Sequence, residues 1–594
     1  MCGLSGELRW DGSNADVEAV AKMTARMSDR GPDGVGVWAQ GPVAIGHRRL
    51  AIIDLTPTGA QPMSDAALGL TVAFNGCIYN YPQLRRELEA AGHRFVSTSD
   101  TEVVLRAYAE WGIRCTERFA GMFAFVIAER DTGRLVLARD RLGIKPLYLS
   151  ESRGRLRFAS TLPALVAAGE VDTDIDPVAL HHYLSFHSVV PAPRTILAGV
   201  RKLPPATVRV VEPDGTSTDT VYWSAPAERN PAQASWSAGD WEDAVLERLR
   251  VAVERRMVSD VPVGVLLSGG LDSSLVVALL AEAGQHGLAT FSIGFEAAGG
   301  ESGDEFSYSD LIARHFGTDH HQIRIDTADV LPALDGTLAA MSEPMVSHDC
   351  IAFYLLSKEV SKHVKVVQSG QGADEVFAGY DWYPPLEGVT REDAAGVYRG
   401  VFVDRPSSAV EDLLVPARRL GRDASAAFVA EHFGAPGAQD ALDAALRIDS
   451  QVMLVDDPVK RVDNMTMAWG LEARVPFLDH ELVELAGRCP PELKLASGGK
   501  GVLKNAARRV VPAEVIDRPK GYFPVPAVRH LSGALLDRVT DAVTGQAARD
   551  RGLFDQSAVQ SLLEKPNENR TTLGSNALWQ VALLEMWLQS MKIT

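Results

Sequence analysis

The chain has 594 residues, a formal net charge of −18 and 46% hydrophobic residues. The length predicts about two to four domains, and so negative a surface repels phosphate backbones, which argues against nucleic-acid binding. No apolar run approaches the ~20 residues of a membrane helix, and five scattered cysteines without C-x-x-C spacing favour a reducing, cytoplasmic location.

The first notable residue is Cys2, directly behind the initiator Met. If Met1 is removed, one residue presents both a thiol and a free α-amine, whose ordinary pKa values are about 8.5 and about 8. The amine can then take the thiol proton without a histidine partner. Two other interpretations are open at this point, a packed small side chain and a lipid anchor. The N-terminus lacks the apolar segment of a lipoprotein signal, which argues against the lipid.

Mixed strands and helices are predicted over residues 1–212. The segments 70–81 and 122–140 are strand-rich, the second with a turn at "RDTGR", and 101–112 has helical spacing with a glycine stop. A stretch rich in Ala, Ser, Pro and polar residues follows, and we expect residues 213–239 to be a linker.

From residue 240 the pattern changes to alternating helix and strand. A helix over 240–259 leads into an apolar strand, a glycine loop and a helix over 261–284. A strand over 288–295, a helix over 308–317 and a strand over 320–325 follow. This alternation predicts a parallel α/β sheet, and the region after 380 is predicted to be mostly helical.

The loop "LLSGGLDSS" lies between a predicted strand and a predicted helix. Small residues and backbone N–H groups at a helix N-terminus attract phosphate oxygens, and Asp272 could hold a Mg²⁺ ion that bridges them. The G-K-[ST] ending of a Walker loop is missing. From the residues alone, a phosphate site and a tight packed turn are both open.

A second loop, in "VKVVQSGQGADEVFAGY", has the same strand–loop–helix order, and Asp374 and Glu375 lie beside it. Two acidic loops at the ends of parallel strands can share one metal–phosphate cluster. The alternative is a solvated acidic turn.

Many short motifs in order carry a resemblance to a known family. The segments "MCG", "RGPDG", "GHRRLAIIDL", "SDTEV" and "ARDRLGIKPLY", and then "SGGLDSS", "LEARVPFLDHELVE" and "RPKGYFP", resemble the glutamine-dependent asparagine synthetases. The resemblance implies an α/β and α+β chain in two domains: an N-terminal Ntn-hydrolase αββα sandwich over residues 2–212, and a doubly wound parallel-sheet ATP-pyrophosphatase domain over 240–594 with a helical C-terminal part.

For the first domain, the resemblance implies a glutaminase. Cys2, exposed by removal of Met1, attacks the side-chain amide of glutamine, and the Asn75 side chain and Gly76 N–H stabilise the oxyanion. Asn75 also binds glutamine, Arg49 pairs with its α-carboxylate and Asp100 holds its α-ammonium.

For the second domain, the resemblance implies that ATP activates a carboxylate as an acyl-adenylate, which ammonia converts to an amide. Asp272 and Asp374 bind Mg²⁺, and Lys520 offsets charge at the reacting phosphate. We expect glutamine, ATP and a carboxylate acceptor as partners, no nucleic acid and no membrane, and a possible homodimer. The expected ATP contacts are Leu267, Ser268, Gly269, Gly270, Asp272, Ser273, Ser274, Ile293, Ser369 and Gly370.

Two positions depart from the family pattern. Cys77 replaces a glutamate that helps bind the α-ammonium of glutamine, and Gln371 replaces a carboxylate near the activated acceptor. Together with "HHYLSFHSVVPAPRTI", these departures resemble the N-acetylglutaminylglutamine amidotransferase subgroup, which amidates an acetylated dipeptide. The alternatives are an asparagine synthetase that uses aspartate and a non-catalytic glutamine-sensing homologue.

Overall fold

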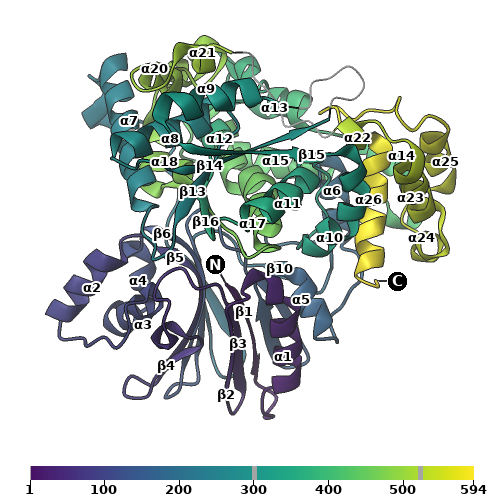
Figure 1. The fold of residues 1–594 in the computed structure, drawn as a ribbon. Helices are drawn as coiled ribbons and strands as arrows, with labels where there is room; N and C mark the ends of the chain where they lie inside the picture. The colour runs from purple at the N-terminus through teal and green to yellow at the C-terminus, as the bar shows by residue number, and fades with distance from the viewer. Residues whose placement is uncertain (1, 297–303, 519–525, 594) are drawn as a thin grey trace.

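A computed structural model of the chain describes residues 2–296, 304–518 and 526–593. Two six-stranded sheets lie face to face in its first part (Figure 1), which we call the N-terminal sandwich. The first sheet has the order β10-β8-β9-β1-β3-β2 and the second β12-β11-β7-β6-β5-β4. The strands are β1 Gly3–Arg9, β2 Gly34–Gln40, β3 Val43–Arg49, β4 Met63–Asp65, β5 Leu70–Ile78, β6 Gly121–Glu129, β7 Leu135–Arg139, β8 Tyr148–Ser152, β9 Arg155–Ala159, β10 Arg201–Lys202, β11 Thr207–Val211 and β12 Ser217–Val221.

Helices cover both outer faces of this sandwich. α1 (Val17–Arg26) and α5 (Leu162–Ala167) pack on the first sheet, and α2 (Tyr81–Ala90) and α3 (Asp100–Trp111) pack on the second. Fully buried side chains such as Leu4, Val126 and Phe158 fill the space between the sheets. The predicted αββα sandwich is therefore confirmed. α4 (Cys115–Arg118) and α6 (Pro177–Ser185) complete its helices.

Local capping explains where the predicted helix after residue 100 begins and ends. The Ser99 side chain accepts a hydrogen bond from the Thr101 N–H, and Gly112 ends the helix with a φ of 59°. The helix therefore starts at Asp100, which places this carboxylate at the helix N-terminus, where the macrodipole favours negative charge.

The segment predicted as a linker, 213–239, contains regular structure. β12 pairs antiparallel with β11 and is an edge strand of the second sheet. The helix α7 (Ala238–Arg255) begins at the end of this segment, where Ser237 and Asp240 form a capping box. The exact domain boundaries stay a prediction.

The second part of the chain, which we call the parallel-sheet domain, has a five-stranded parallel sheet of order β15-β14-β13-β16-β17. Its strands are β13 Val263–Leu266, β14 Ala289–Phe295, β15 Asp319–Ile325, β16 Val366–Gln368 and β17 Glu472–Arg474. The chain winds outward from β13 to β15 and then returns to the other side of β13, so the order reverses between β13 and β16. Ligands of doubly wound sheets bind at this reversal, beyond the carboxyl ends of the strands.

Alternation along β13 supplies a core on each face of the sheet. Val263 and Val265 pack with α7 and α8 (Leu271–Glu282), while Leu266 packs on the opposite side with α10 (Val330–Ala340) and α11 (Asp349–Val360). α9 (Phe306–Phe316) adjoins α8, and α12 (Ala373–Phe377) follows β16. The predicted doubly wound parallel sheet is confirmed.

The region after residue 380 is mostly helical, as predicted, and β17 is its one named strand among the described residues. α16 (Ala441–Ile448) continues through two π-helical turns, Asp449–Met453 and Val455–Val459, into α17 (Lys460–Met467). Such turns are rare and often mark functional positions. The other helices are α13 Ala394–Phe402, α14 Ser407–Leu413, α15 Ala424–Gly434, α18 His480–Arg488, α19 Pro491–Leu495, α20 Gly501–Ala507, α21 Ala513–Ile516, α22 Pro526–Arg529, α23 Gly533–Thr544, α24 Gln546–Arg551, α25 Gln556–Glu564 and α26 Ala577–Ser590.

The C-terminal helix α26 is a core element. Its residues from Ala577 to Leu588 are all buried, and it packs against α10 and α23 (Figure 1). The indole N–H groups of Trp579 and Trp587 donate to the carbonyls of Val346 at 3.0 Å and Met341 at 3.1 Å. Within the described ranges, no helix has the length and apolarity needed to span a bilayer.

We predict that Trp587→Ala destabilises the parallel-sheet domain by about 3–5 kcal/mol, because it leaves a large cavity and an unpaired Met341 carbonyl in a fully buried site. Urea unfolding followed by circular dichroism measures the loss. Val96→Ala, at a side chain that is 78% exposed, is the control and should change stability by less than about 0.5 kcal/mol. Equal effects of the two substitutions would contradict the core role of α26.

Candidate functional site

Cys2 lies immediately before β1 and lines a cavity that we call the thiol cavity. Its side chain is buried, and burial raises the pKa of its thiol above the ordinary value. The nearby His47 is also buried, and its pKa falls to about 3, so its ring is neutral. Since His47 does not line the Cys2 cavity, a thiolate here needs another proton acceptor, and the α-amine of a processed Cys2 is such a group.

Asn75 and Gly76 are on β5, directly beside Cys2. The Cys2 N–H donates to Asn75 Oδ1 at 2.9 Å. The Asn75 Nδ2 group is buried and has no hydrogen-bond partner among the described residues. Position 76 requires glycine, because a Cβ there would lie 2.1 Å from the Met122 carbonyl oxygen. The structure therefore leaves one preorganised amide donor next to the thiol.

The other two predicted glutamine contacts line the same cavity. The Arg49 guanidinium donates to the Thr56 carbonyl at 2.9 Å and also contacts the Asp54 carbonyl. Asp100 is buried and accepts from the Ile78 N–H at 3.1 Å. Burial dominates its titration and raises its pKa to about 7. The structure therefore brings together the predicted site residues Cys2, Arg49, Asn75, Gly76 and Asp100.

The parallel-sheet domain supplies part of this cavity, which the sequence did not indicate. Glu472 and Arg474 of β17 line it, joined by a 2.6 Å hydrogen bond. Although burial opposes ionisation of Glu472, neighbouring cationic groups, Arg474 among them, lower its pKa to about 2. Asp260 accepts a hydrogen bond at 2.8 Å from the N–H of Asp54, the residue that follows the lining residue Ile53. Both Glu472 and Arg474 belong to the motif "LEARVPF", but the motif alone does not indicate which cavity they line.

A second cavity, of about 380 Å³, lies at the carboxyl ends of β13 and β16, within the range typical of small-molecule sites. It is lined by eight of the predicted ATP contacts: Leu267, Ser268, Gly270, Asp272, Ser273, Ile293, Ser369 and Gly370. Gly269 and Ser274 are not in its lining. Gly269 packs against α9, where a Cβ would lie 2.6 Å from the Ser309 nitrogen, and Ser274 is fully buried in α8.

The two loops approach each other closely in this cavity. A Cβ at Gly370 would lie 2.9 Å from the Asp272 Cβ, so the second loop packs directly on the first turn of α8. Asp272 and Asp374 both bind the Lys500 ammonium, at 2.7 and 3.0 Å. Two carboxylates beside a phosphate-type loop are the oxygen donors that Mg²⁺ commonly uses together with substrate phosphates, so these residues fit the predicted metal.

Lys500 is the functional candidate that the sequence analysis missed. It precedes α20 in "SGGKG" with a φ of 57°, and its side chain is buried. Burial alone lowers its pKa, but Asp272 and Asp374 together raise it above the ordinary value, so the amine is charged. A lysine between glycines at a helix start was the available signal. Lys520, the predicted phosphate lysine, lies outside the described residues.

The cavity is also lined by Gln371 of the second loop and by Arg461 and Tyr380. Arg461 is buried, and its Nη1 donates to Ser347 Oγ at 2.7 Å. The Tyr380 hydroxyl donates to Glu375 at 2.7 Å, and burial followed by the charge of Asp374 raises the pKa of Glu375 to about 7. This part of the cavity therefore offers both hydrogen-bond donors and acceptors.

Comparison with known proteins gives the same division of the chain. A family model described as "Glutamine amidotransferase domain" matches residues 1–223, and one described as "Asparagine synthase" matches residues 244–589. Asparagine synthetase (glutamine-hydrolyzing) 1 of Bacillus subtilis is 32% identical over 99% of this chain and 96% of its own length. A putative asparagine synthetase of Mycobacterium tuberculosis is 32% identical over 99% and 97%, and the amidase chry2 of Gibberella zeae is 26% identical over 95% of both chains.

The N-terminal sandwich and the parallel-sheet domain correspond to a glutamine amidotransferase domain joined to an asparagine synthase domain. The chain belongs to the asparagine synthase family.

We predict that the KM for glutamine falls about tenfold between pH 6 and pH 8. With a pKa of about 7, Asp100 is mostly protonated at pH 6 and mostly ionised at pH 8, and only the ionised form attracts an α-ammonium. Steady-state glutaminase assays measure this dependence. Asp100→Asn should raise the KM and flatten its pH dependence; a wild-type KM that is constant over this range would contradict the assignment.

We predict that Lys500→Gln lowers ATP-dependent pyrophosphate release by about 100-fold, because the cavity loses the cation that faces Asp272 and Asp374. Glutamine hydrolysis should stay within about twofold. Lys504→Gln is the matched control: Lys504 lines the same cavity, but its ammonium bonds the Ser497 carbonyl at 2.7 Å. An equal loss in both variants would show that Lys500 has no special role.

Proposed function

We propose that the protein releases ammonia from glutamine at Cys2 and transfers it to a carboxylate that ATP has activated as an acyl-adenylate, with AMP and pyrophosphate as products. The observation that carries this proposal is the pairing of two built sites in one chain. Cys2 lies beside an unpaired amide donor in one, and Asp272, Asp374 and Lys500 meet at the sheet reversal in the other.

In the first site, the α-amine of Cys2 takes the thiol proton, and Asn75 Oδ1 orients that amine. The sulfur attacks the glutamine amide carbon, and Asn75 Nδ2 and the Gly76 N–H stabilise the oxyanion. Arg49 and Asp100 hold the α-carboxylate and α-ammonium.

In the second site, Ser268, Gly270 and Ser273 would bind pyrophosphate oxygens, and the apolar Leu267 and Ile293 would contact the base. Asp272 and Asp374 would hold Mg²⁺, which supplies charge neutralisation for the phosphates when bound. Lys500 stabilises the negative charge on the departing pyrophosphate. The sequence predicts a similar role for Lys520.

The acceptor that we propose is an acetylated dipeptide, N-acetylglutaminylglutamine. Gln371 supports it, because an amide at this wall suits an acceptor that is itself amide-rich and has no free ammonium. Aspartate is the second candidate, since relatives at 32% identity carry the name asparagine synthetase. The amidase name of another relative indicates that similarity over the whole chain does not fix the product. We also propose that the protein is cytoplasmic.

The acceptor test supplies ATP, Mg²⁺ and glutamine with either aspartate or N-acetylglutaminylglutamine and identifies amides by mass spectrometry. We expect amidation and stoichiometric AMP with the dipeptide. Amidation of aspartate alone would replace the first candidate by the second. Glutamine hydrolysis without any ATP turnover would favour the glutamine-sensing homologue.

We predict that Cys2→Ala abolishes glutamine-dependent amide formation while ammonia-dependent formation stays within about twofold, because the substitution removes only the nucleophile. Cys77→Ala, in the same cavity, is the control and should retain glutamine use. The mass of the purified chain reports whether Met1 is removed. Glutamine-dependent activity in Cys2→Ala would contradict the nucleophile assignment.

A further inference from the structure

The helix α17 lines the cavity beyond the carboxyl ends of β13 and β16, which we call the ATP-type cavity, and it also contacts the N-terminal sandwich. Arg461 lines the ATP-type cavity, and two residues further along, Asp463 binds cationic side chains of the N-terminal sandwich. The Asp463 carboxylate accepts from Arg30 Nη1 at 2.9 Å and from Lys145 Nζ at 3.3 Å. All three of these interdomain partners are at least nine-tenths buried.

Arg30 extends this contact to the nucleophile. Its Nε donates to the Cys2 carbonyl oxygen at 3.3 Å, while its Nη1 binds Asp463. One planar guanidinium therefore spans the distance from the backbone of Cys2 to a carboxylate of the parallel-sheet domain. A lysine ammonium is a point charge without this rigid, planar fork of donors, so it does not reproduce the span of the guanidinium.

Cys2 depends on such contacts because it becomes the first residue after removal of Met1. Its only covalent neighbour is then Gly3, and the chain end is fixed by two hydrogen bonds: the Cys2 nitrogen to Asn75 and the Cys2 carbonyl to Arg30. A displacement of about 1 Å at a reacting group can cost about 100-fold in rate.

The charges agree with this geometry. Burial alone would raise the pKa of Asp463, but Arg30 and then Lys145 hold it below its ordinary value, so the carboxylate is ionised. Without that carboxylate, the buried Arg30 loses its counter-charge, and a buried unpaired ion is costly. Arg30 would then move toward water or the protein would rearrange, and the Cys2 carbonyl would lose its donor.

We propose that Asp463 is a positioning residue for the Cys2 nucleophile, so that the parallel-sheet domain completes the glutaminase site of the N-terminal sandwich through Arg30. The inference rests on the proposed role of Cys2 in glutamine hydrolysis. Asp463 touches no substrate and acts only through Arg30.

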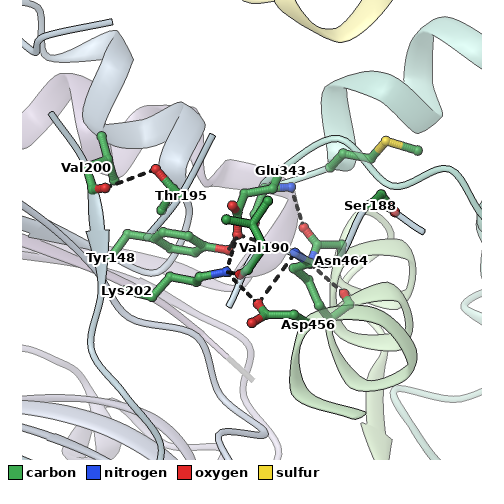
Figure 2. Close-up of polar contacts among 12 residues, drawn as sticks. Tyr148, Ser188, Val190, Thr195, Val200, Lys202, Glu343, Asp456 and Asn464 are labelled. Atoms are coloured by element: carbon green, nitrogen blue, oxygen red, sulfur yellow. Dashed lines mark hydrogen bonds and ion pairs between the residues drawn. The ribbon is translucent and has the colours of Figure 1, made fainter. Parts of the chain in front are cut away.

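A separate charge cluster also joins the two domains (Figure 2). Lys202 of the N-terminal sandwich binds Asp456 at 2.7 Å and Glu343 at 3.1 Å. Lys460 approaches Glu343 at 3.3 Å. The Tyr148 hydroxyl donates to Glu343 at 3.4 Å. Asp456 is as buried as Asp463, lies on the same continuous helical segment and does not contact Arg30, so it supplies a matched control.

The test compares Asp463→Asn with Asp456→Asn in the full-length protein. We expect Asp463→Asn to lower the kcat of glutamine hydrolysis by about tenfold or more, with the KM for glutamine and ammonia-dependent amide formation within about twofold of wild type. Asp456→Asn should leave the ratio of glutamine-dependent to ammonia-dependent activity unchanged, even if it lowers the melting temperature.

Arg30→Lys provides a second variant in case Asp463→Asn does not fold, and it should show the same kcat loss with retained ammonia use. The inference is overturned if Asp463→Asn, or Arg30→Lys where the first does not fold, keeps wild-type glutaminase kcat. It is also overturned if glutamine-dependent and ammonia-dependent rates fall together, or if Asp456→Asn loses glutaminase equally. Cys2→Ala distinguishes failure of the proposed function from failure of this inference. If Cys2→Ala still hydrolyses glutamine, both the proposed function and this inference are overturned. If Cys2→Ala loses hydrolysis while Asp463→Asn keeps it, this inference alone is overturned.

Discussion

Ion pairs buried between the N-terminal sandwich and the parallel-sheet domain constrain the rest of the structure. Removing a charge from water costs several kcal/mol per ion unless a partner and further hydrogen bonds compensate it. Among the described residues, Lys145, Lys202 and Arg30 form their ion pairs with carboxylates of the other domain. The pairs are therefore satisfied in one docked arrangement, and any sliding of the domains leaves several buried ions uncompensated.

The thiol cavity takes part of its wall from this docking, because β17 brings Glu472 and Arg474 to it. The ATP-type cavity is lined by the parallel-sheet domain, and α17 connects it to the interface by presenting Arg461 to the cavity and Asp463 to the N-terminal sandwich. In the ATP-type cavity, Lys500 also neutralises two carboxylates that would otherwise repel each other across the meeting point of the loops.

Local patterns predicted the elements well, because each depends on neighbours in sequence. The apolar strand, glycine loop and helix at 261–284 appear as β13, the loop and α8, and Ser99 and Gly112 set the limits of α3. The sequence also placed Cys2, Asn75 and Asp100 in one site, through the resemblance to a family. Sequence spacing could not show that Lys500 lies between Asp272 and Asp374, because Lys500 and Asp272 are 228 residues apart.

Contacts between domains were beyond prediction for the same reason. Asp463 and Arg30 are 433 residues apart, and an Asp within a helical pattern is ordinarily read as a solvated face. β12 was missed because its five residues are all exposed, so no apolar alternation distinguishes them from a linker. Burial and pairing at long range, and not local propensity, decide these positions.

The position of α26 in the core bears on how the protein is made. The N-terminal sandwich has all its strands by residue 221 and can fold while the ribosome is still translating. Helix α10, by contrast, lacks its partner α26 until residues 577–588 have been synthesised. The nascent chain therefore carries the apolar surface of α10 that α26 covers until translation is nearly finished.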